Sequence, residues 1–206
     1  MSLSLANSFN EVLGMDLKHW DGKYFLVMVD LFTRFCSATI INDKAPETII
    51  RGIFKSWIVI FGRPCKILTD NGGEFNNEKM HNMAENFDIT LMCTAAESPW
   101  SNGIVERLNG VLGIGVSRII HDTGCPPDVA LSWMVSARNA LPNYQGYSPN
   151  QLVFGFNPVL PSLWSSGPPA LEGRVISRVI SDNLNAMWKA REEFVSWSPM
   201  KKSREL

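Results

Sequence analysis

Three carboxylic acids occupy positions from which they could do chemistry together. Asp16 interrupts an otherwise apolar strand-like run, and Asp70 ends a second such run directly before an Asn-Gly-Gly turn sequence. Glu106 follows near the start of a segment with helical periodicity, with 35 residues between it and Asp70. An aspartate before Asn-Gly is commonly just a turn residue. An unpaired carboxylate in an apolar strand costs free energy, so the position of Asp16 indicates a functional role.

The first third of the sequence predicts three antiparallel strands and a helix. The apolar runs 11–19 and 23–31 are joined by Asp21-Gly22, a dipeptide that suits a tight hairpin turn. A third run, 35–41, follows after a very short connection and completes a meander. The period then changes, and residues 45–61 have apolar side chains at helical spacing up to a Gly-Arg-Pro breaker. Asp30, at the end of the second run, is interpreted as a structural turn acid.

The next segments predict crossover strands that bring the acids together. Residues 65–69 form a short strand pattern, 76–86 a helix pattern and 89–93 a fifth strand pattern. Three antiparallel strands followed by helix-crossover strands imply a mixed five-stranded sheet flanked by helices, an α/β fold. If the first and fourth strands are parallel neighbours, Asp16 and Asp70 project from the same region of the sheet.

The remaining residues predict helices and a linker. Helices are expected at about 101–121, at 128–139, in a short stretch opening at Ser148 and at 174–197, where the apolar residues lie roughly on one face. Proline and glycine concentrate between the last two helices. The predicted division is a lead-in at 1–9, a catalytic core at 10–160, a linker at 161–173 and a C-terminal helix and tail at 174–206.

Composition limits the class of protein. The chain has 206 residues, of which 45% are hydrophobic and 19% charged, and this composition excludes a disordered charged chain. Its net charge is −1, so any electrostatic attraction for nucleic acid must be local. No apolar run approaches the length of a membrane span, and the first residues do not form a secretory signal. An intracellular protein without membrane contact is expected. The four cysteines are widely spaced and predict reduced thiols rather than a zinc site.

Several ordered motifs carry a family resemblance. They are Asp70-Asn-Gly-Gly-Glu-Phe75, the segment Ser98–Asn109 around Glu106, and two further segments at 29–35 and 147–155. With the 35-residue spacing, they resemble the D,D(35)E catalytic core of retroviral and LTR-retrotransposon integrases, the last segment being similar to gypsy-type elements. The resemblance covers about residues 10–160, within the wider RNase H-like polynucleotidyl transferases.

The resemblance implies a fold, a triad and a reaction. The fold is RNase H-like, and Asp16, Asp70 and Glu106 are the catalytic triad. Clustered carboxylates need cations, and their hard oxygens select Mg²⁺ or Mn²⁺. A two-ion centre is implied, with Asp16 on both ions, Asp70 on one and Glu106 on the other. Water first trims a DNA 3′ end, and the new 3′-OH then attacks target DNA, in a protein that is expected to be nuclear.

Further residues are implied as DNA contacts, and partners follow from the reaction. Asn109, Asn102, Trp100 and Arg107 are weaker candidates for DNA binding, with structural roles as the alternative. Joining two DNA ends at nearby target positions implies a homodimer or higher multimer. The family's upstream His/His/Cys/Cys module is not found in these 206 residues, so no structural zinc is expected.

One departure leaves two function classes open. Gly110 and Gly113 stand where family members often carry basic residues, and Gly115 follows. These glycines weaken the helix and remove phosphate contacts, unless they are close-packing residues. The intact acids favour an active integrase core. The glycines favour a domesticated or degenerate integrase-derived protein that serves as a nucleic-acid or protein interaction module without integration activity.

Overall fold

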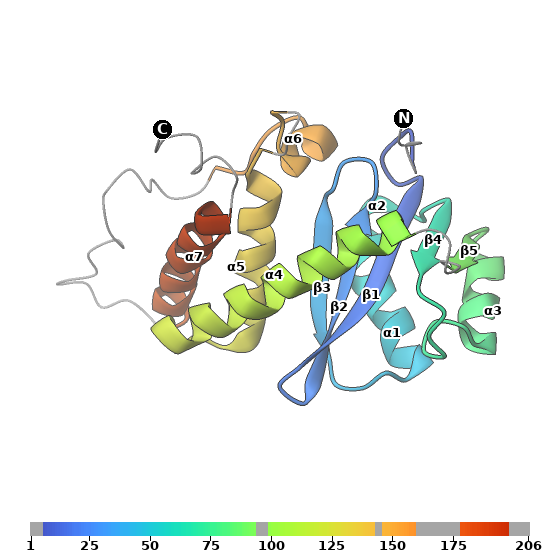
Figure 1. Ribbon diagram of the computed structural model, residues 1–206, viewed down its shortest axis with the longest axis horizontal. Helices are drawn as coiled ribbons and strands as arrows, with labels where there is room; N and C mark the ends of the chain where they lie inside the picture. The colour runs from blue at the N-terminus through green and yellow to red at the C-terminus, as the bar shows by residue number, and fades with distance from the viewer. Residues whose placement is uncertain (1–5, 94–98, 143–145, 160–177, 198–206) are drawn as a thin grey trace. The chain divides into compact units, whose positions relative to one another are not determined.

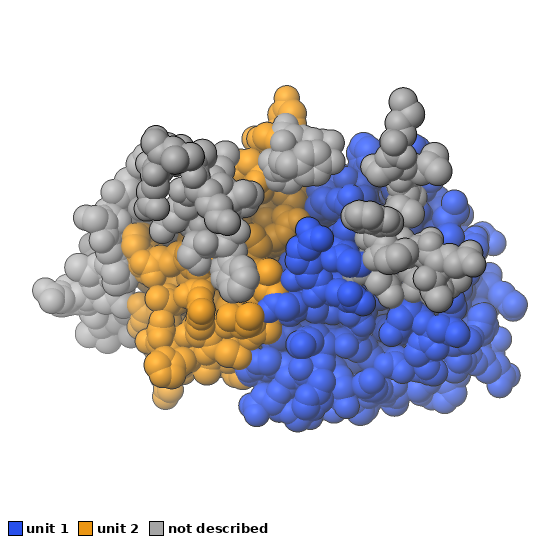
Figure 2. All heavy atoms as spheres, viewed as in Figure 1, with its two compact units in different colours: residues 1–110 blue, residues 111–206 orange. Residues whose placement is uncertain are grey.

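The computed structural model describes residues 6–93, 99–142, 146–159 and 178–197 (Figure 1), with the backbone alone at 99–102 and 195–197. The chain forms two compact units, residues 1–110 and 111–206, coloured separately in Figure 2. The boundary between the units falls within one long helix. Each unit is considered by itself.

Unit 1 contains the predicted five-stranded mixed sheet, in the order β3-β2-β1-β4-β5. β1 pairs antiparallel with β2, and β2 with β3, while β4 runs parallel to both β1 and β5. The hairpin turn has positive φ at Asp21 and Gly22, as the Asp-Gly dipeptide predicts. The strands are β1 (Val12–Trp20), β2 (Lys23–Asp30), β3 (Cys36–Ile41), β4 (Lys66–Thr69) and β5 (Thr90–Cys93).

The helix predicted at 45–61 is present but interrupted by a π-helix. It consists of α1 (Pro46–Ile53), η1 (Phe54–Ile58) and α2 (Val59–Phe61). A π-turn shifts the helical face by a residue, which a fixed sequence period does not detect. Trp57 in η1 is fully buried, whereas Val59 and Ile60 directly after it are 77% and 61% exposed.

The two faces of the sheet carry different helices. Alternation along β1 places Gly14 and Asp16 on one face and Leu13 and Met15 on the other. A Cβ on Gly14 would stand 3.0 Å from Val105 in the first half of α4 (Pro99–Thr123), so this helix lies close over β1. α1 packs on the opposite face, and Figure 1 shows the sheet between the two helices.

The close approach at Gly14 gives a first testable prediction. Gly14→Val is expected to destabilise the fold by about 1–3 kcal/mol, although valine favours strands, because its side chain would overpack Val105 and Leu31. Gly14→Ala should cost less. Urea unfolding of the three proteins checks this order, and a valine variant as stable as the wild type would show that α4 does not press on β1 here.

A buried polar hub fastens the start of β1 to the turn after β2. Asp30 is fully buried and accepts hydrogen bonds from the Asn10 amide at 2.9 Å and from the Thr33 amide and hydroxyl, each at 2.7 Å. The Asn10 side chain donates to the carbonyls of Phe61 and Arg63 and accepts from the indole of Trp57. These contacts support the prediction that Asp30 is a structural turn acid.

The other crossover helix of unit 1, α3 (Glu78–Asn86), follows the turn after β4. The Asn77 side chain caps it by accepting from the Met80 amide, and also donates to the carbonyls of Gly73 and Glu74. Hydrogen bonds from the cap residue of α3 therefore hold the C-terminal end of the turn that begins at Asp70.

Unit 2 is helical. It contains the C-terminal half of α4, α5 (Pro127–Ala140), α6 (Pro149–Phe154) and α7 (Arg178–Trp197). α7 packs along α5, where the Trp133 indole donates to Asn183 at 2.9 Å. Arg118 of α4 pairs with Glu193 of α7 at 2.8 Å. The helix expected at 174–197 thus packs back onto its own chain, an alternative that the sequence left open.

Two expectations concern regions that the structure leaves largely undescribed. The predicted linker, 161–173, and the first residues of the last predicted helix, 174–177, lie outside the described residues. The predicted domain division therefore stays a prediction. No helix in the described ranges is both long and apolar enough to cross a membrane.

Candidate active site

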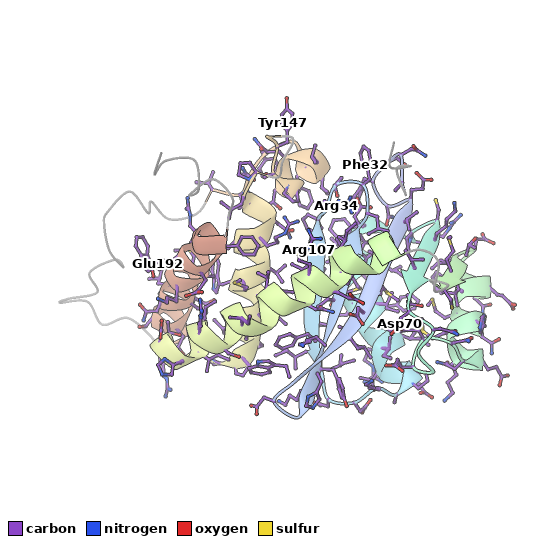
Figure 3. All side chains as sticks on the ribbon, viewed as in Figure 1. Phe32, Arg34, Asp70, Arg107, Tyr147 and Glu192 are labelled. Carbon is purple, nitrogen blue, oxygen red and sulfur yellow. The ribbon has the colours of Figure 1, made fainter. Side chains whose placement is uncertain are left out.

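The ladder between β1 and β4 brings the two aspartates to one region. Gly14 pairs with Leu68 at the last rung of this parallel ladder, and Asp16 and Asp70 each follow two residues later. Two residues is one full strand period, so Asp16 lies on the same face as Gly14, the face that α4 covers, and Asp70 directly follows the neighbouring strand. Asp16 is half-buried within β1, and Asp70 is exposed in the turn after β4 (Figure 3).

The third acid comes from α4 and is placed by its neighbours. Val105 is buried over Gly14, so the next residue, Glu106, is held close to β1 while its own side chain is exposed. Asn109 follows three residues later on the same side of the helix and is almost fully buried. The close packing at Gly14 therefore positions both polar side chains.

Asp16 lies at the centre of this arrangement. Its two carboxylate oxygens accept hydrogen bonds from the Asn109 side-chain amide at 2.6 Å and from the Leu17 backbone amide at 2.7 Å. Burial raises the pKa of Asp16 most, and the negative charges of Asp70 and Glu106 raise it further, against the lowering effect of the two hydrogen bonds. The three predicted acids thus interact electrostatically.

The residues fit a divalent cation by type and by charge. All three acids offer hard oxygen ligands, and a bound cation would offset the burial and repulsion that disfavour ionised Asp16. The buried amide oxygen of Asn109 also has no hydrogen-bond partner among the described atoms. As they stand, no three His, Cys, Asp or Glu side chains of the described residues are arranged to hold a metal ion.

The turn around Asp70 contains polar contacts that the sequence predicted only in outline. The Gly72 amide donates to Asp70 at 3.2 Å, and the Asn76 side chain donates to Asn71, also at 3.2 Å. Glu74 pairs with Lys44 at 2.8 Å. Sequence reasoning missed Lys44 and Glu74 as site neighbours, because the lysine lies in the distant connection between β3 and α1 and no local pattern marks it.

The predicted DNA contacts have different environments. Arg107 is exposed on α4 (Figure 3) and, being adjacent to Glu106, points to a different side of that helix. Asn109 is buried and donates to Asp16, so in this structure it orients an acid. The side chains of Trp100 and Asn102 lie outside the described residues. DNA binding by these four residues stays a prediction.

Two of the α4 glycines have opposite surroundings. Gly110 is exposed, and a Cβ there would meet nothing within 4 Å, so a longer side chain would fit. At Gly115, within unit 2, a Cβ would collide with Met134 of α5. Close packing therefore explains Gly115 but not Gly110.

Comparisons with known proteins agree with this fold. Residues 6–99 match the family model of the Integrase core domain. A stretch of 141 residues is 30% identical to the Gag-Pro-Pol polyprotein of bovine leukemia virus and covers 65% of this chain and 10% of that polyprotein. The chain spans 15% or less of the curated relatives that head the comparison.

Solved structures show the same architecture. The HTLV-2 integrase catalytic core domain in complex with magnesium matches with a TM-score of 0.62 and 22% identity over 70% of this chain and 97% of that one. A chain of the simian T-cell lymphotropic virus intasome in complex with PP2A regulatory subunit B56 gamma matches with a TM-score of 0.65 and 25% identity, over 79% and 60%. The architecture is therefore the RNase H-like fold of integrase catalytic cores. Over residues 6–99 this chain is thus similar to the integrase core domain family, and its curated relatives include Pol polyproteins of retroviruses and of a retrotransposon.

Proposed function

We propose that this chain is the catalytic core of an integrase that processes DNA 3′ ends and transfers them to target DNA in a metal-dependent reaction. The observation that supports the proposal best is that Asp70 and Glu106 lie near enough to Asp16 for their charges to raise its pKa. Acids placed so as to repel one another fit a site that works with a cation.

Different residues would hold the metal ions and orient the acids. Asp16, Asp70 and Glu106 would hold Mg²⁺ or Mn²⁺, which when bound activates the attacking oxygen and stabilises the leaving oxygen. Asn109 and the Leu17 amide orient the two oxygens of Asp16. The Gly72 amide does the same for one oxygen of Asp70. Preset orientation lowers the reorganisation needed when the DNA phosphate arrives.

Partners and location follow from the proposed reaction. The substrates are the ends of the element and a target duplex, so the protein works where chromosomal DNA is, in the nucleus. Joining two ends favours a symmetric multimer of this chain. The related HTLV-2 core is described in dimeric and trimeric forms, which supports self-association here.

The alternative is a domesticated or degenerate integrase-derived module that binds nucleic acid or protein without catalysis. It rests on the α4 glycines, and the exposed position of Gly110 is compatible with it. The intact set of three interacting acids favours the active core, because an interaction module has no need of that arrangement.

A disintegration assay tests the proposed activity. The chain is incubated with a labelled branched DNA in Mg²⁺ or Mn²⁺, and strand joining is followed on a denaturing gel. We expect product from the wild type, none with EDTA and none from Asp70→Asn, which keeps the shape of the side chain but removes its charge. Absence of product from the wild type, or an Asp70→Asn variant as active as the wild type, would refute the proposed activity.

A further inference from the structure

A lysine that the catalytic role does not use stands next to the site. Lys44 lies in the connection between β3 and α1, and its ammonium group contacts Glu74 Oε1 at 2.8 Å. The same ammonium lies 5.4 Å from the centroid of the Tyr24 ring, within the range of a cation–π contact. Two side chains from different parts of unit 1 therefore fix the position of this cation.

Glu74 connects this cation to the catalytic region. The point where a Cβ of Gly72 would stand is 2.8 Å from Glu74 Oε2 and 3.1 Å from Asp70 Oδ1, so the two carboxylates lie within about 6 Å of each other. The pKa of Lys44 is raised chiefly by its hydrogen bond to Glu74, with smaller contributions from the charges of Glu74, Tyr24 and Asp70. Lys44 is thus close enough to Asp70 to be affected by its charge.

The ammonium group still has capacity for a ligand. A lysine has three N–H donors, and Glu74 accepts from one of them. The Lys44 side chain is 46% exposed, whereas that of Glu74 is 21% exposed. An anion that approaches Asp70 from solvent can therefore reach Lys44 without displacing its partner.

The charges around the site indicate which anion this is. Asp16, Asp70, Glu106 and Glu74 place four carboxylates in one region, which repels a polyanion. The substrate of the proposed reaction carries a phosphate on either side of the one that reacts. A fixed cation at the border of the acid cluster would compensate part of this repulsion.

We propose that Lys44 binds a backbone phosphate of the DNA next to the reacting one, with Glu74 and Tyr24 holding its ammonium in place. This inference rests on the proposed function in that it takes DNA as the substrate. Lys44 contributes to the affinity for DNA and positions the duplex relative to Asp70. It does not read the base sequence, since a phosphate contact carries no sequence information.

A second Lys–Glu pair in the same unit provides the matched control. Lys79 of α3 is hydrogen-bonded to Glu47 of α1, and both side chains are more exposed than those of the Lys44 pair, at 58% and 57%. Lys79→Gln and Lys44→Gln change the net charge equally and each breaks one surface ion pair. Surface pairs contribute at most about 1 kcal/mol to stability, so both variants should fold.

The first experiment measures the salt dependence of DNA binding. Affinity for a fluorescein-labelled 20-bp duplex is determined by anisotropy in CaCl₂ at 50 and 200 mM salt. One phosphate contact contributes about 0.9 to the slope of log K against log salt, or about 3.5-fold over this range. We expect Lys44→Gln to lose this contribution, Lys44→Arg to keep it and Lys79→Gln to match the wild type. Equal slopes for the Lys44→Gln and Lys79→Gln variants would overturn the proposal.

A second experiment uses the unaltered chain. Brief acetylation followed by mass spectrometry compares the labelling of Lys44 and Lys79 with and without the duplex. Protection of Lys44 alone is expected, and equal labelling of Lys44 in both samples would overturn the proposal even if a variant failed to fold. Neither measurement needs turnover. A failure of the Lys44 contact is therefore distinguishable from a failure of the activity, which the disintegration assay reports.

Discussion

Replacing Asp16 by asparagine is expected to lower metal-dependent DNA strand joining by about 10³-fold or more while leaving the fold intact. Loss of a ligand that supports charge stabilisation in the transition state costs several kcal/mol, and about 4 kcal/mol corresponds to a factor of about 10³ in rate. Asparagine keeps the shape and one carbonyl oxygen for the hydrogen bonds of Asn109 or Leu17. The disintegration assay measures the rate.

The free energy of unfolding of Asp16→Asn should rise, although its activity falls. The pKa of Asp16 in the folded chain is raised above its ordinary value of 3.8, chiefly by burial. Such a group contributes stability that is fully present below pH 3.8 and is lost as the pH rises through the raised folded pKa. At pH 7, ionised Asp16 therefore costs stability, and an asparagine that never ionises removes this cost. Urea unfolding without metal should find Asp16→Asn at least as stable as the wild type.

The pH and metal dependence separate this explanation from a general structural effect. The variant should unfold with a larger free energy than the wild type once the pH rises above about 3.8. This difference should become constant above the pKa of Asp16 in the folded chain. Mg²⁺ should stabilise the wild type, because it binds the folded chain, and have less effect on the variant. A variant that is less stable at pH 7 and responds to Mg²⁺ like the wild type would contradict this role for Asp16.

The sheet was predictable because its signals are local. Alternation, the Asp21-Gly22 turn and the short apolar runs identified five strands, and the parallel pairing of β1 with β4 was the arrangement that the positions of Asp16 and Asp70 required. The helix predicted at 45–61 was correct in extent. Its π-helical middle was not predictable, since the wide turn depends on how Trp57 packs among Phe9, Phe35 and Phe61.

The missed parts of the site depend on contacts between distant residues. The hydrogen bond from Asn109 to Asp16 spans 93 positions, and the Lys44–Glu74 pair spans 30. Sequence reasoning placed Asn109 on the same helical face as Glu106 and assigned it to DNA from the family resemblance. The close approach of α4 at Gly14 cannot be seen in a periodic pattern. Spacing and the family resemblance singled out the three acids as candidates, but only the fold shows which neighbours contact them.

The largest stability effect is expected at Asp30. Asp30→Ala removes the acceptor for the Thr33 amide and hydroxyl, both buried, and for the Asn10 amide, which is partly buried. A buried donor left without a partner costs about 1–3 kcal/mol, so about 3–5 kcal/mol is expected for the group of three. Urea unfolding measures this loss.

Two control variants separate the acceptor from its surroundings. Thr33→Val removes the hydroxyl, which donates to Asp30 and also accepts from the Phe35 amide at 3.2 Å, and should cost about 1–2 kcal/mol. Asp30→Asn keeps one acceptor oxygen and should lie between Thr33→Val and Asp30→Ala. Asn10 connects the Asp30 cluster to the end of α2 and to the Trp57 indole.

Loss of the Asp30 hydrogen bonds should therefore increase local opening at the start of β1, the strand that carries Asp16. In the Asp30→Asn variant, the β1 amides should then exchange their hydrogens faster than the amides of α5. Unchanged exchange in β1, or an Asp30→Ala cost below about 1 kcal/mol, would mean that the hub does not hold the catalytic strand.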